Sequence, residues 1–405
     1  MSIVNWFVAL GFGFQVGAAC AQTGEPIKIA GSFDLSGPAA ALGQDAFLGA
    51  QFAVEVINKR GGVLGRPVAL EHQDNGTNPQ RAVNQATALV RDGAVMLISP
   101  ISSGSTLAVS KTVSAKMKVP MCVAVSASEN ITGKDFQPYL FSMPPTTYMM
   151  MRAITVRLAK QPYKRYALIV PDYAGGRDAS IRFKEFMKEL NPQAQIVVEE
   201  YPKLGATDYT ATINKVLAAQ PDYVWTQVYG SDLLTFSKQA AALGLFKQIN
   251  NKFMTVYDGN TLKALGDNAP VGSEGYQLAP FNHLLKSGVD ARDIVTRFKA
   301  KTGGYPSDWS LLAYDCVTAW ANAANAAKST DADAVMRSIE RTSFNSARGA
   351  LRFAKYDHEV EAPVYIGKVA QSKEFGQAVL DIEDVVPASI THPVEAVIQK
   401  MRQPE

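Results

Sequence analysis

The stretch AVMLISPISSGSTLAVS, residues 94–110, carries two patterns in succession. Residues 94–100 form a short apolar run, which is typical of a strand buried on both faces of a sheet. A helical period follows over 105–117, and three serines, a glycine and a threonine occupy 102–106 between the two. Hydroxyls at this point either cap the helix or hold an anion at its start, and this stretch alone leaves both interpretations open.

The same alternation of strand and helix extends to both sides of this stretch. The expected strands of this half of the chain are 27–33, 67–74, 94–100 and 120–126. Helices are expected over 45–58, 79–91 and 105–117. This order predicts a parallel sheet with helices on both faces.

The alternation starts again after Pro144-Pro145. Strands are expected at 165–171, 195–202, 223–229 and 253–258, and helices at 147–160, 178–190, 209–219, 231–243, 290–303, 308–328 and 331–341. Segments 350–357 and 362–370 are predicted to pair as a terminal hairpin, and the tail from Lys373 has no firm assignment. The sequence therefore predicts an α/β protein with two doubly wound parallel-sheet lobes.

Length and composition agree with two globular lobes. The chain has 405 residues, well above the roughly 150 of one domain. Apolar residues make up 47% and charged residues 19%, as in a soluble globular protein. The formal net charge of +3 is small and no basic face is evident, so we expect no nucleic-acid partner.

The first 21 residues differ from the rest. Residues 3–19 carry no charge, and Ala19-Cys20-Ala21 fits a cleavage site, so residues 1–21 are predicted to be a secretory signal peptide. There is no Lys or Arg before the apolar core, and the alternative is a membrane anchor. Export with cleavage places the mature chain in the periplasm.

The sequence contains few residues in patterns that are typical of catalysis or metal binding. The four histidines are scattered, no phosphate-binding loop or nucleophile elbow is present, and we expect no metal, no cofactor and no catalytic residue. Cys122 and Cys316 are expected to be two buried free thiols rather than a bridge. The chain is therefore predicted to bind rather than to catalyse.

Two hydroxyl-rich loops follow neighbouring strands of the first predicted sheet. Ser102 and Ser103 come after one strand, and Ser126 and Ser128 come after the next. Ligands of open parallel sheets bind beyond the carboxyl ends of the strands, and a helix start adds unpaired N–H groups there. The pair of loops predicts a site for a small carboxylate, with separate capping roles as the alternative.

Several stretches resemble one known family. These are IAGSFDLSGPAAALGQD, GAQFAVEVINKRGGVLGRPVALEHQDNGTNPQRAV, ISPISSGST and VAVSASENIT. They are similar to the branched-chain amino acid-binding proteins of bacterial ABC transporters, which are type I periplasmic solute-binding proteins. The resemblance covers about residues 26–370.

The resemblance implies a Venus-flytrap fold of two lobes joined by three crossover segments, near 143–147, 279–282 and 353–360. Lobe one would comprise 26–145 plus 281–355. Lobe two would comprise 146–280 plus 356–405, with the tail placed least firmly. The ligand would lie between the lobes, which close by hinge motion.

The resemblance also implies ligand-binding residues. Ser103, with Ser102, matches the carboxylate-binding loop. Ser126, Ala127 and Ser128 match a segment that holds the amino acid head group. Tyr229 matches an aromatic residue that covers the ligand from lobe two, with packing at a strand end as the alternative.

Other positions depart from the family pattern. Leu42 stands where a tyrosine is common, and Tyr173 would compensate for a glycine at an aromatic position. Matching without gaps puts Tyr257 where an acid pairs with the ligand ammonium, while Asp258 is one residue later and has a turn role as its alternative. Trp309 lies near a pocket aromatic or in the core.

The predicted function is an extracytoplasmic solute-binding protein of an ABC importer. It would act as a monomer, bind a small carboxylate-bearing solute such as an aliphatic or branched-chain amino acid, and deliver that solute to a membrane permease. One alternative ligand is an aromatic or other carboxylic acid without an amino group. A second alternative is a ligand sensor rather than a transport receptor.

Overall fold

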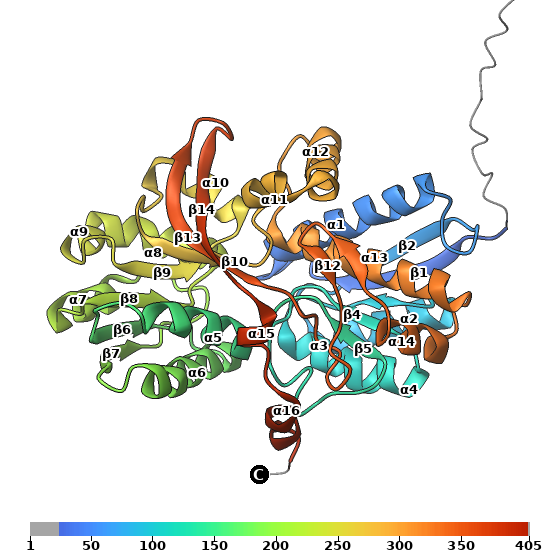
Figure 1. Ribbon diagram of the computed structural model, residues 1–405, viewed down its shortest axis with the longest axis horizontal. Helices are drawn as coiled ribbons and strands as arrows, with labels where there is room; N and C mark the ends of the chain where they lie inside the picture. Colours follow the sequence, from blue (N-terminus) through green and yellow to red (C-terminus); the bar gives the residue numbers. More distant parts are fainter. Residues whose placement is uncertain (1–23, 404–405) are drawn as a thin grey trace, which may run out of the picture.

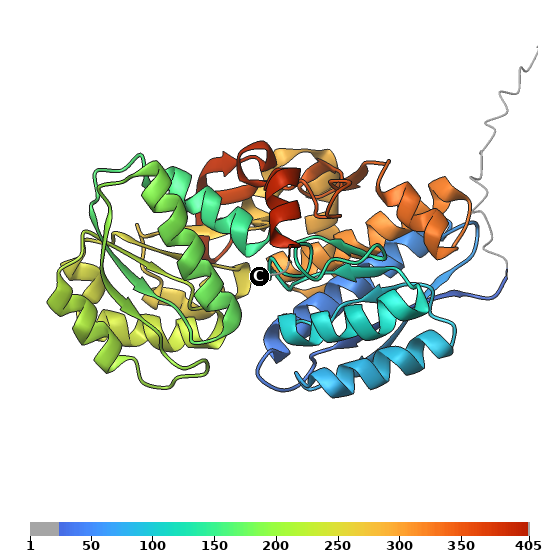
Figure 2. The same ribbon diagram turned by 90° about the horizontal axis from the view of Figure 1, so that it is seen from below.

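The computed structural model describes residues 24–403, and Figure 1 shows two α/β lobes lying side by side. The predicted signal peptide, residues 1–21, lies outside the described residues. Each lobe has its own sheet with helices on both faces (Figure 2), so the two doubly wound lobes predicted from the sequence are confirmed. Across residues 24–403, no helix has both the length and the apolar character needed to span a bilayer.

The first sheet has five parallel strands in the order β2-β1-β3-β4-β5. Its strands are β1 (Ile27–Phe33), β2 (Val68–Asp74), β3 (Leu97–Ile98), β4 (Met121–Val123) and β5 (Leu140–Ser142). Its connecting helices are α1 (Ala40–Lys59), α2 (Pro79–Arg91) and α3 (Ser103–Val109), which continues through a π-helical turn (Ser110–Ser114) into α4 (Ala115–Met117). Asn78 caps α2 by accepting from the Arg81 N–H, and Pro79 fits the first turn because it has no N–H to satisfy.

The second sheet has seven strands in the order β14-β13-β10-β9-β8-β6-β7. Its parallel strands are β6 (Arg165–Ile169), β7 (Gln195–Glu200), β8 (Tyr223–Thr226), β9 (Phe253–Val256) and β10 (Glu274–Gln277). The antiparallel strands β13 (Val364–Ser372) and β14 (Gln377–Val386) extend one edge. Its helices are α5 (Thr147–Leu158), α6 (Ala174–Leu190), α7 (Thr210–Ala219), α8 (Gly230–Ala242), α9 (Leu245–Gln248) and α10 (Gly259–Leu265), followed by a 3-10 turn (Gly266–Asn268).

The remaining elements complete the two lobes. They are α11 (Phe281–Ser287), α12 (Val289–Thr302), α13 (Asp308–Ala327), α14 (Ala332–Ile339), the short pair β11 (Phe344–Ser346) and β12 (Gly349–Leu351), α15 (Ala388–Thr391) and α16 (Glu395–Met401). Helix α13 packs along α1 and completes the core of the first lobe. A side chain at Gly49 of α1 would collide with the Ser310 carbonyl of α13, so the close approach of these helices requires glycine there.

The predicted terminal hairpin is wrong in its pairing. Strand β13 covers the predicted segment 362–370, but its partner is β14, inside the tail that had no assignment. Segment 350–357 contributes only the end of β12, which pairs with β11. Strands β5 and β10 and helices α10 and α11 were not predicted, because short elements such as LFS and EGYQ carry no periodic signal.

The prediction of two free thiols is also wrong. Cys122 of β4 and Cys316 of α13 form a disulfide with Cα atoms 5.7 Å apart, and both residues are fully buried. The two cysteines are 194 residues apart, so no local spacing in the sequence indicated that they would form a disulfide. They meet because α13 returns late in the chain to cover the first sheet.

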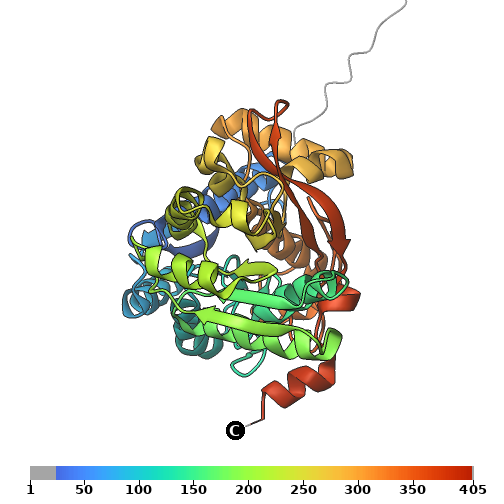
Figure 3. The same cartoon turned by 90° about the vertical axis from the view of Figure 1, so that its left-hand side faces the viewer.

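The chain passes between the two sheets three times within the described residues: after β5, between β10 and α13, and after β12. Each lobe is therefore assembled from separate parts of the sequence, and Figure 3 shows the β13–β14 hairpin running along the second lobe. The exact lobe boundaries, at 145/146, 280/281 and 355/356, stay a prediction.

Candidate functional site

Both sheets share one strand order, which defines where a ligand is expected. Read from the outer edge, β7-β6-β8-β9-β10 repeats the order 2-1-3-4-5 of the first sheet. In such sheets the chain leaves strands one and three toward opposite faces, and ligands bind in the crevice outside the carboxyl ends there. Ser102 and Ser103 follow β3, while Tyr173 follows β6 and Tyr229 follows β8. The predicted residues thus come to the switch points of both sheets.

The two serine loops are fastened to each other. The Ser126 hydroxyl donates to the Ile101 carbonyl at 2.7 Å and shares a second hydrogen bond of 2.7 Å with the Thr106 hydroxyl. All these atoms lie at the carboxyl ends of the adjacent strands β3 and β4. The structure therefore brings the two predicted loops together as one buried, hydrogen-bonded unit.

The four serines have different surroundings. Ser102 caps α3, because its Oγ accepts from the Ser105 N–H at 3.2 Å, and it also donates to the Ser105 hydroxyl at 2.9 Å. The hydroxyls of Ser103 and Ser128 have no hydrogen-bond partner among residues 24–403. The Ala127 carbonyl accepts from the Thr147 N–H at 2.8 Å. Ser103 and Ser128 are therefore the hydroxyls left available for a ligand.

One positioning residue was missed from the sequence. Asp34 directly follows β1 and is fully buried, and its Oδ2 accepts from the Ile101 N–H at 2.8 Å and from Asn75 at 3.2 Å. Burial raises the pKa of Asp34. Asp34 fixes the backbone at the start of the serine loop. The acid immediately after the apolar run IKIAGSF was the available signal.

Two tyrosines form the part of the candidate site that lobe two contributes. Tyr173 and Tyr229 occupy the N-cap positions of α6 and α8, and their ring centroids are 6.4 Å apart in an edge-on arrangement. Burial raises the pKa of both, so both phenols are neutral at pH 7. This pair offers an aromatic surface with hydroxyls at its edge.

The structure separates the two candidates for an ammonium partner. Tyr257 is 1% exposed and packs over Gly275 in the core of lobe two. Asp258 is partly exposed and caps α10, accepting from the N–H groups of Asn260 and Thr261 at 2.9 Å each and from the Thr261 hydroxyl at 2.6 Å. Burial raises the pKa of Asp258.

Two further carboxylates lie near Asp258. Burial raises the pKa of Asp45, on α1, to about 6, and the nearby negative charge of Asp258 adds to this rise. Burial likewise raises the pKa of Asp308, at the start of α13, to about 6. Asn260 donates to both oxygens of Asp45, at 3.0 and 2.8 Å. Because Asp45 belongs to the first lobe and Asn260 to the second, this contact joins the lobes.

Two apolar candidates lie at the margin of the first lobe. Leu42 and Trp309 are partly buried and pack against its core. The Trp309 Nε1 is buried and has no acceptor within the described part of the chain. An unpaired buried donor of this kind is a candidate for a ligand acceptor.

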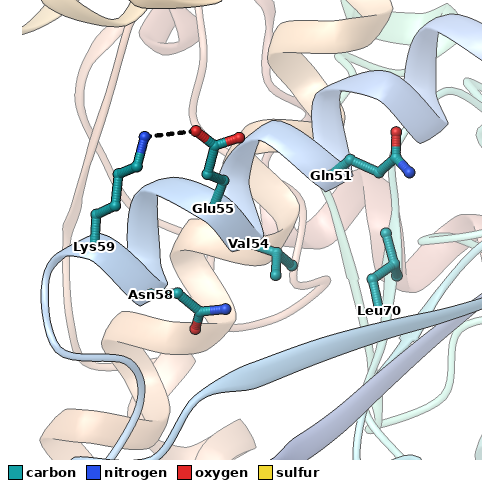
Figure 4. Close-up of a pocket in the computed structure, with 6 residues that line it drawn as sticks. All are labelled: Gln51, Val54, Glu55, Asn58, Lys59 and Leu70. Carbon is teal, nitrogen blue, oxygen red and sulfur yellow. Dashed lines mark hydrogen bonds and ion pairs between the residues drawn. The ribbon is translucent and has the colours of Figure 1, made fainter. Parts of the chain in front are cut away.

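A hollow elsewhere on the first lobe contains none of these residues. It has a volume of about 610 Å³ and opens on the outer side of α1 (Figure 4). It is lined by Gln51, Val54, Glu55, Asn58 and Lys59 of α1 and Leu70 of β2. The strand ends, rather than this hollow, hold the convergent polar groups. Among the described residues no group of His, Cys, Asp or Glu is arranged to bind a metal ion.

Comparison with known proteins identifies the family. A model of the periplasmic binding protein family matches residues 26–374, so the chain belongs to that family. The Leu/Ile/Val-binding protein homolog 4 of Brucella abortus is 24% identical, with 88% of this chain and 89% of the relative covered. The leucine-, isoleucine-, valine-, threonine- and alanine-binding protein of Pseudomonas aeruginosa is also 24% identical, covering 83% and 88%.

The fold comparison agrees. A solute-binding protein of an ABC transporter from Rhodopseudomonas palustris, solved with 3,4-dihydroxybenzoic acid, superposes with a TM-score of 0.81 at 21% identity. The match covers 90% of this chain and 98% of that one. The fold is that of a type I periplasmic binding protein, and the chain is a solute-binding protein rather than an enzyme.

Proposed function

We propose that the mature chain is the extracytoplasmic receptor of an ABC importer. It binds a small carboxylate-bearing solute between its lobes and delivers it, as a monomer, to a membrane permease after the signal peptide at 1–21 is removed. The observation that carries the proposal is the fastened pair of serine loops. Ser126 and Thr106 hold the loops together, while Ser103 and Ser128 keep unused hydroxyls.

The serine loops suit a carboxylate head group. Hydrogen bonds to a charged group contribute about 1.5–3 kcal/mol each, so two hydroxyls and the N–H groups at the start of α3 supply enough energy for specific binding. The tyrosine pair of lobe two then covers the bound solute when the lobes close.

The preferred ligand is an aliphatic amino acid. Asp258 and Asp45 place negative charge at the carboxyl end of β9 and on α1, where a ligand ammonium would relieve their mutual repulsion. The relatives from Brucella and Pseudomonas carry names of aliphatic amino acid-binding proteins, which supports this choice.

An aromatic acid without an amino group is the second candidate. Asp258 already accepts three hydrogen bonds from the first turn of its own helix, which leaves little capacity for an ammonium group. The tyrosine pair and Trp309 offer aromatic contacts instead, and the Rhodopseudomonas protein was solved with such an acid.

Two measurements test the proposal. Native mass spectrometry of the exported protein identifies co-purifying ligand, and calorimetry with leucine, glutamate and benzoate ranks the classes. Stoichiometric binding of leucine that weakens in Asp258→Asn supports the amino acid. Binding of benzoate alone, unchanged in Asp258→Asn, supports the second candidate. Absence of any carboxylate ligand in both measurements contradicts the proposal.

A further inference from the structure

The segment 387–402 runs from one lobe to the other along the hinge. It leaves β14, the edge strand of the seven-stranded sheet, and ends in α16 between the lobes (Figures 1 and 2). It lies beyond residues 26–374, the range matched to the family. We call this segment the strap.

The strap first contacts lobe two. Its helix α15 packs against α5, the first helix of the second lobe. Thr391, the last residue of α15, is fully buried. The beginning of the strap is therefore anchored to lobe two both through the chain and through packing.

The middle of the strap is bonded to the third crossover. His392 Nε2 lies 3.0 Å from the Asp357 carboxylate, and both side chains are more than nine-tenths buried. The Tyr356 hydroxyl donates to the Pro393 carbonyl at 2.8 Å. The strap thus crosses the hinge in contact with the chain that forms it.

The end of the strap is bonded to lobe one. The Arg402 guanidinium donates to the carbonyls of Gly133 at 3.2 Å and Thr132 at 3.0 Å, in the loop that follows β4, and to the Tyr356 carbonyl at 2.8 Å. The same group lies over the Phe136 ring, 4.2 Å from its centroid. One side chain therefore joins the strap to lobe one and to the crossover at once.

The strap also packs against a buried junction at the hinge. Glu129 and Thr132 of lobe one, Tyr148 of α5 and Asp357 of the crossover meet there, beside Ile398 and Met401 of the strap. Ile398 is 3% exposed. Removal of the strap would expose apolar surface together with buried polar groups, which disfavours its release.

We propose that the strap is a non-covalent connection between the lobes, additional to the three covalent crossovers, that limits their hinge motion. The three covalent crossovers allow rotation, whereas the Arg402 contacts with lobe one must stretch or break when the lobes rotate apart. The strap therefore narrows the range of interlobe distances in the ligand-free protein, beside the Asn260–Asp45 contact and the Arg182–Glu129 ion pair, which also join the lobes. This inference does not depend on the identity of the ligand.

The test measures interlobe distance without ligand. Spin labels at Lys116→Cys on α4 and Lys188→Cys on α6, both exposed positions, report the separation by electron–electron double resonance. The label pair is placed in the wild type, in Arg402→Ala and in a chain ending at Val386. Arg165→Ala is the matched control, since Arg165 also donates to backbone carbonyls, those of Ala219 and Gln220, but within lobe two.

We expect the distance distribution to broaden in Arg402→Ala and further in the shortened chain. Loss of three hydrogen bonds from a charged donor should raise the population outside the wild-type range roughly tenfold. The Arg165→Ala distribution should match the wild type. Unchanged distributions in both strap variants overturn the proposal, and if the shortened chain does not fold, an unchanged Arg402→Ala alone overturns it.

Discussion

The two sides of the proposed site share a strand order but not a construction. On lobe one, short hydroxyls are held by bonds within the loops, as Ser126 is by Ile101 and Thr106. On lobe two, the matching strand ends carry the large rings of Tyr173 and Tyr229. Fixed small donors define the position of a charged group, whereas an aromatic surface accepts many shapes. The contrast suggests that lobe one holds the common head group and lobe two the variable part.

The largest expected effect tests whether lobe one is the more rigid partner. Its disulfide joins β4 to α13 beneath the serine loops, and no cysteine occurs in residues 146–280. Replacement of Cys122 and Cys316 together by alanine should lower the free energy of unfolding by about 2–4 kcal/mol. Urea unfolding of the oxidised wild type and the double variant measures it. Equal stabilities would show that packing alone makes lobe one rigid.

The next prediction separates two serines of lobe one. Ser126→Ala leaves the Ile101 carbonyl without its donor and removes one of the two hydrogen bonds of the Thr106 hydroxyl, which still donates to the Pro100 carbonyl. It should cost about 1–3 kcal/mol of unfolding free energy. Ser103→Ala should leave stability unchanged and weaken ligand binding by at least about 1 kcal/mol. Urea unfolding and calorimetry measure the two quantities. Unchanged affinity in Ser103→Ala would return that residue to a role in the first turn of α3.

A smaller effect concerns the contact between the lobes. The folded pKa of Asp45 is about 6, above its ordinary 3.8, so folding favours the protonated carboxyl. The resulting stability is present below about pH 4 and is lost as the pH rises through 6, by about 1–2 kcal/mol after screening. Asp45→Asn should remove the part of the decline that Asp45 causes and leave the part due to Asp308, while the exposed Asp92→Asn should keep the whole decline. Unfolding at pH 4.5 and 7 measures the difference, and parallel profiles of Asp45→Asn and wild type would contradict it.

The smallest effect is expected on lobe two. Tyr229→Phe keeps the ring beside Tyr173 and removes only the hydroxyl. Ligand affinity should fall by less than about 1 kcal/mol, because an aromatic cover depends on area more than on one neutral bond. Calorimetry beside Ser103→Ala gives the comparison. A loss of ligand affinity as large as that of Ser103→Ala would mean that both lobes bind the head group. The proposed division of roles between the two lobes would then be wrong.

The sequence predicted which residues lie at the ends of strands better than it predicted the hydrogen bonds that those residues form. The apolar runs and helical periods placed Ser102, Ser103, Ser126 and Tyr229 at the ends of strands, because strand and helix periods are local properties. Ser102 caps through Ser105, three residues away, but the bonds of Ser126 across the loops depend on neighbours 20 or more residues away. The disulfide was missed for the same reason, since its cysteines are 194 residues apart, whereas the β13–β14 hairpin is local and was missed because the tail received no assignment.

The late arrival of α13 has a consequence for biogenesis. Residues 27–142 supply all five strands of the first sheet, but the helix that packs beside α1 to complete its cover, and the second thiol, come from residues 308–327. A chain that crosses a membrane from its N-terminus therefore cannot complete this lobe until about three quarters of its length has emerged. The disulfide between Cys122 and Cys316 can form only after that point.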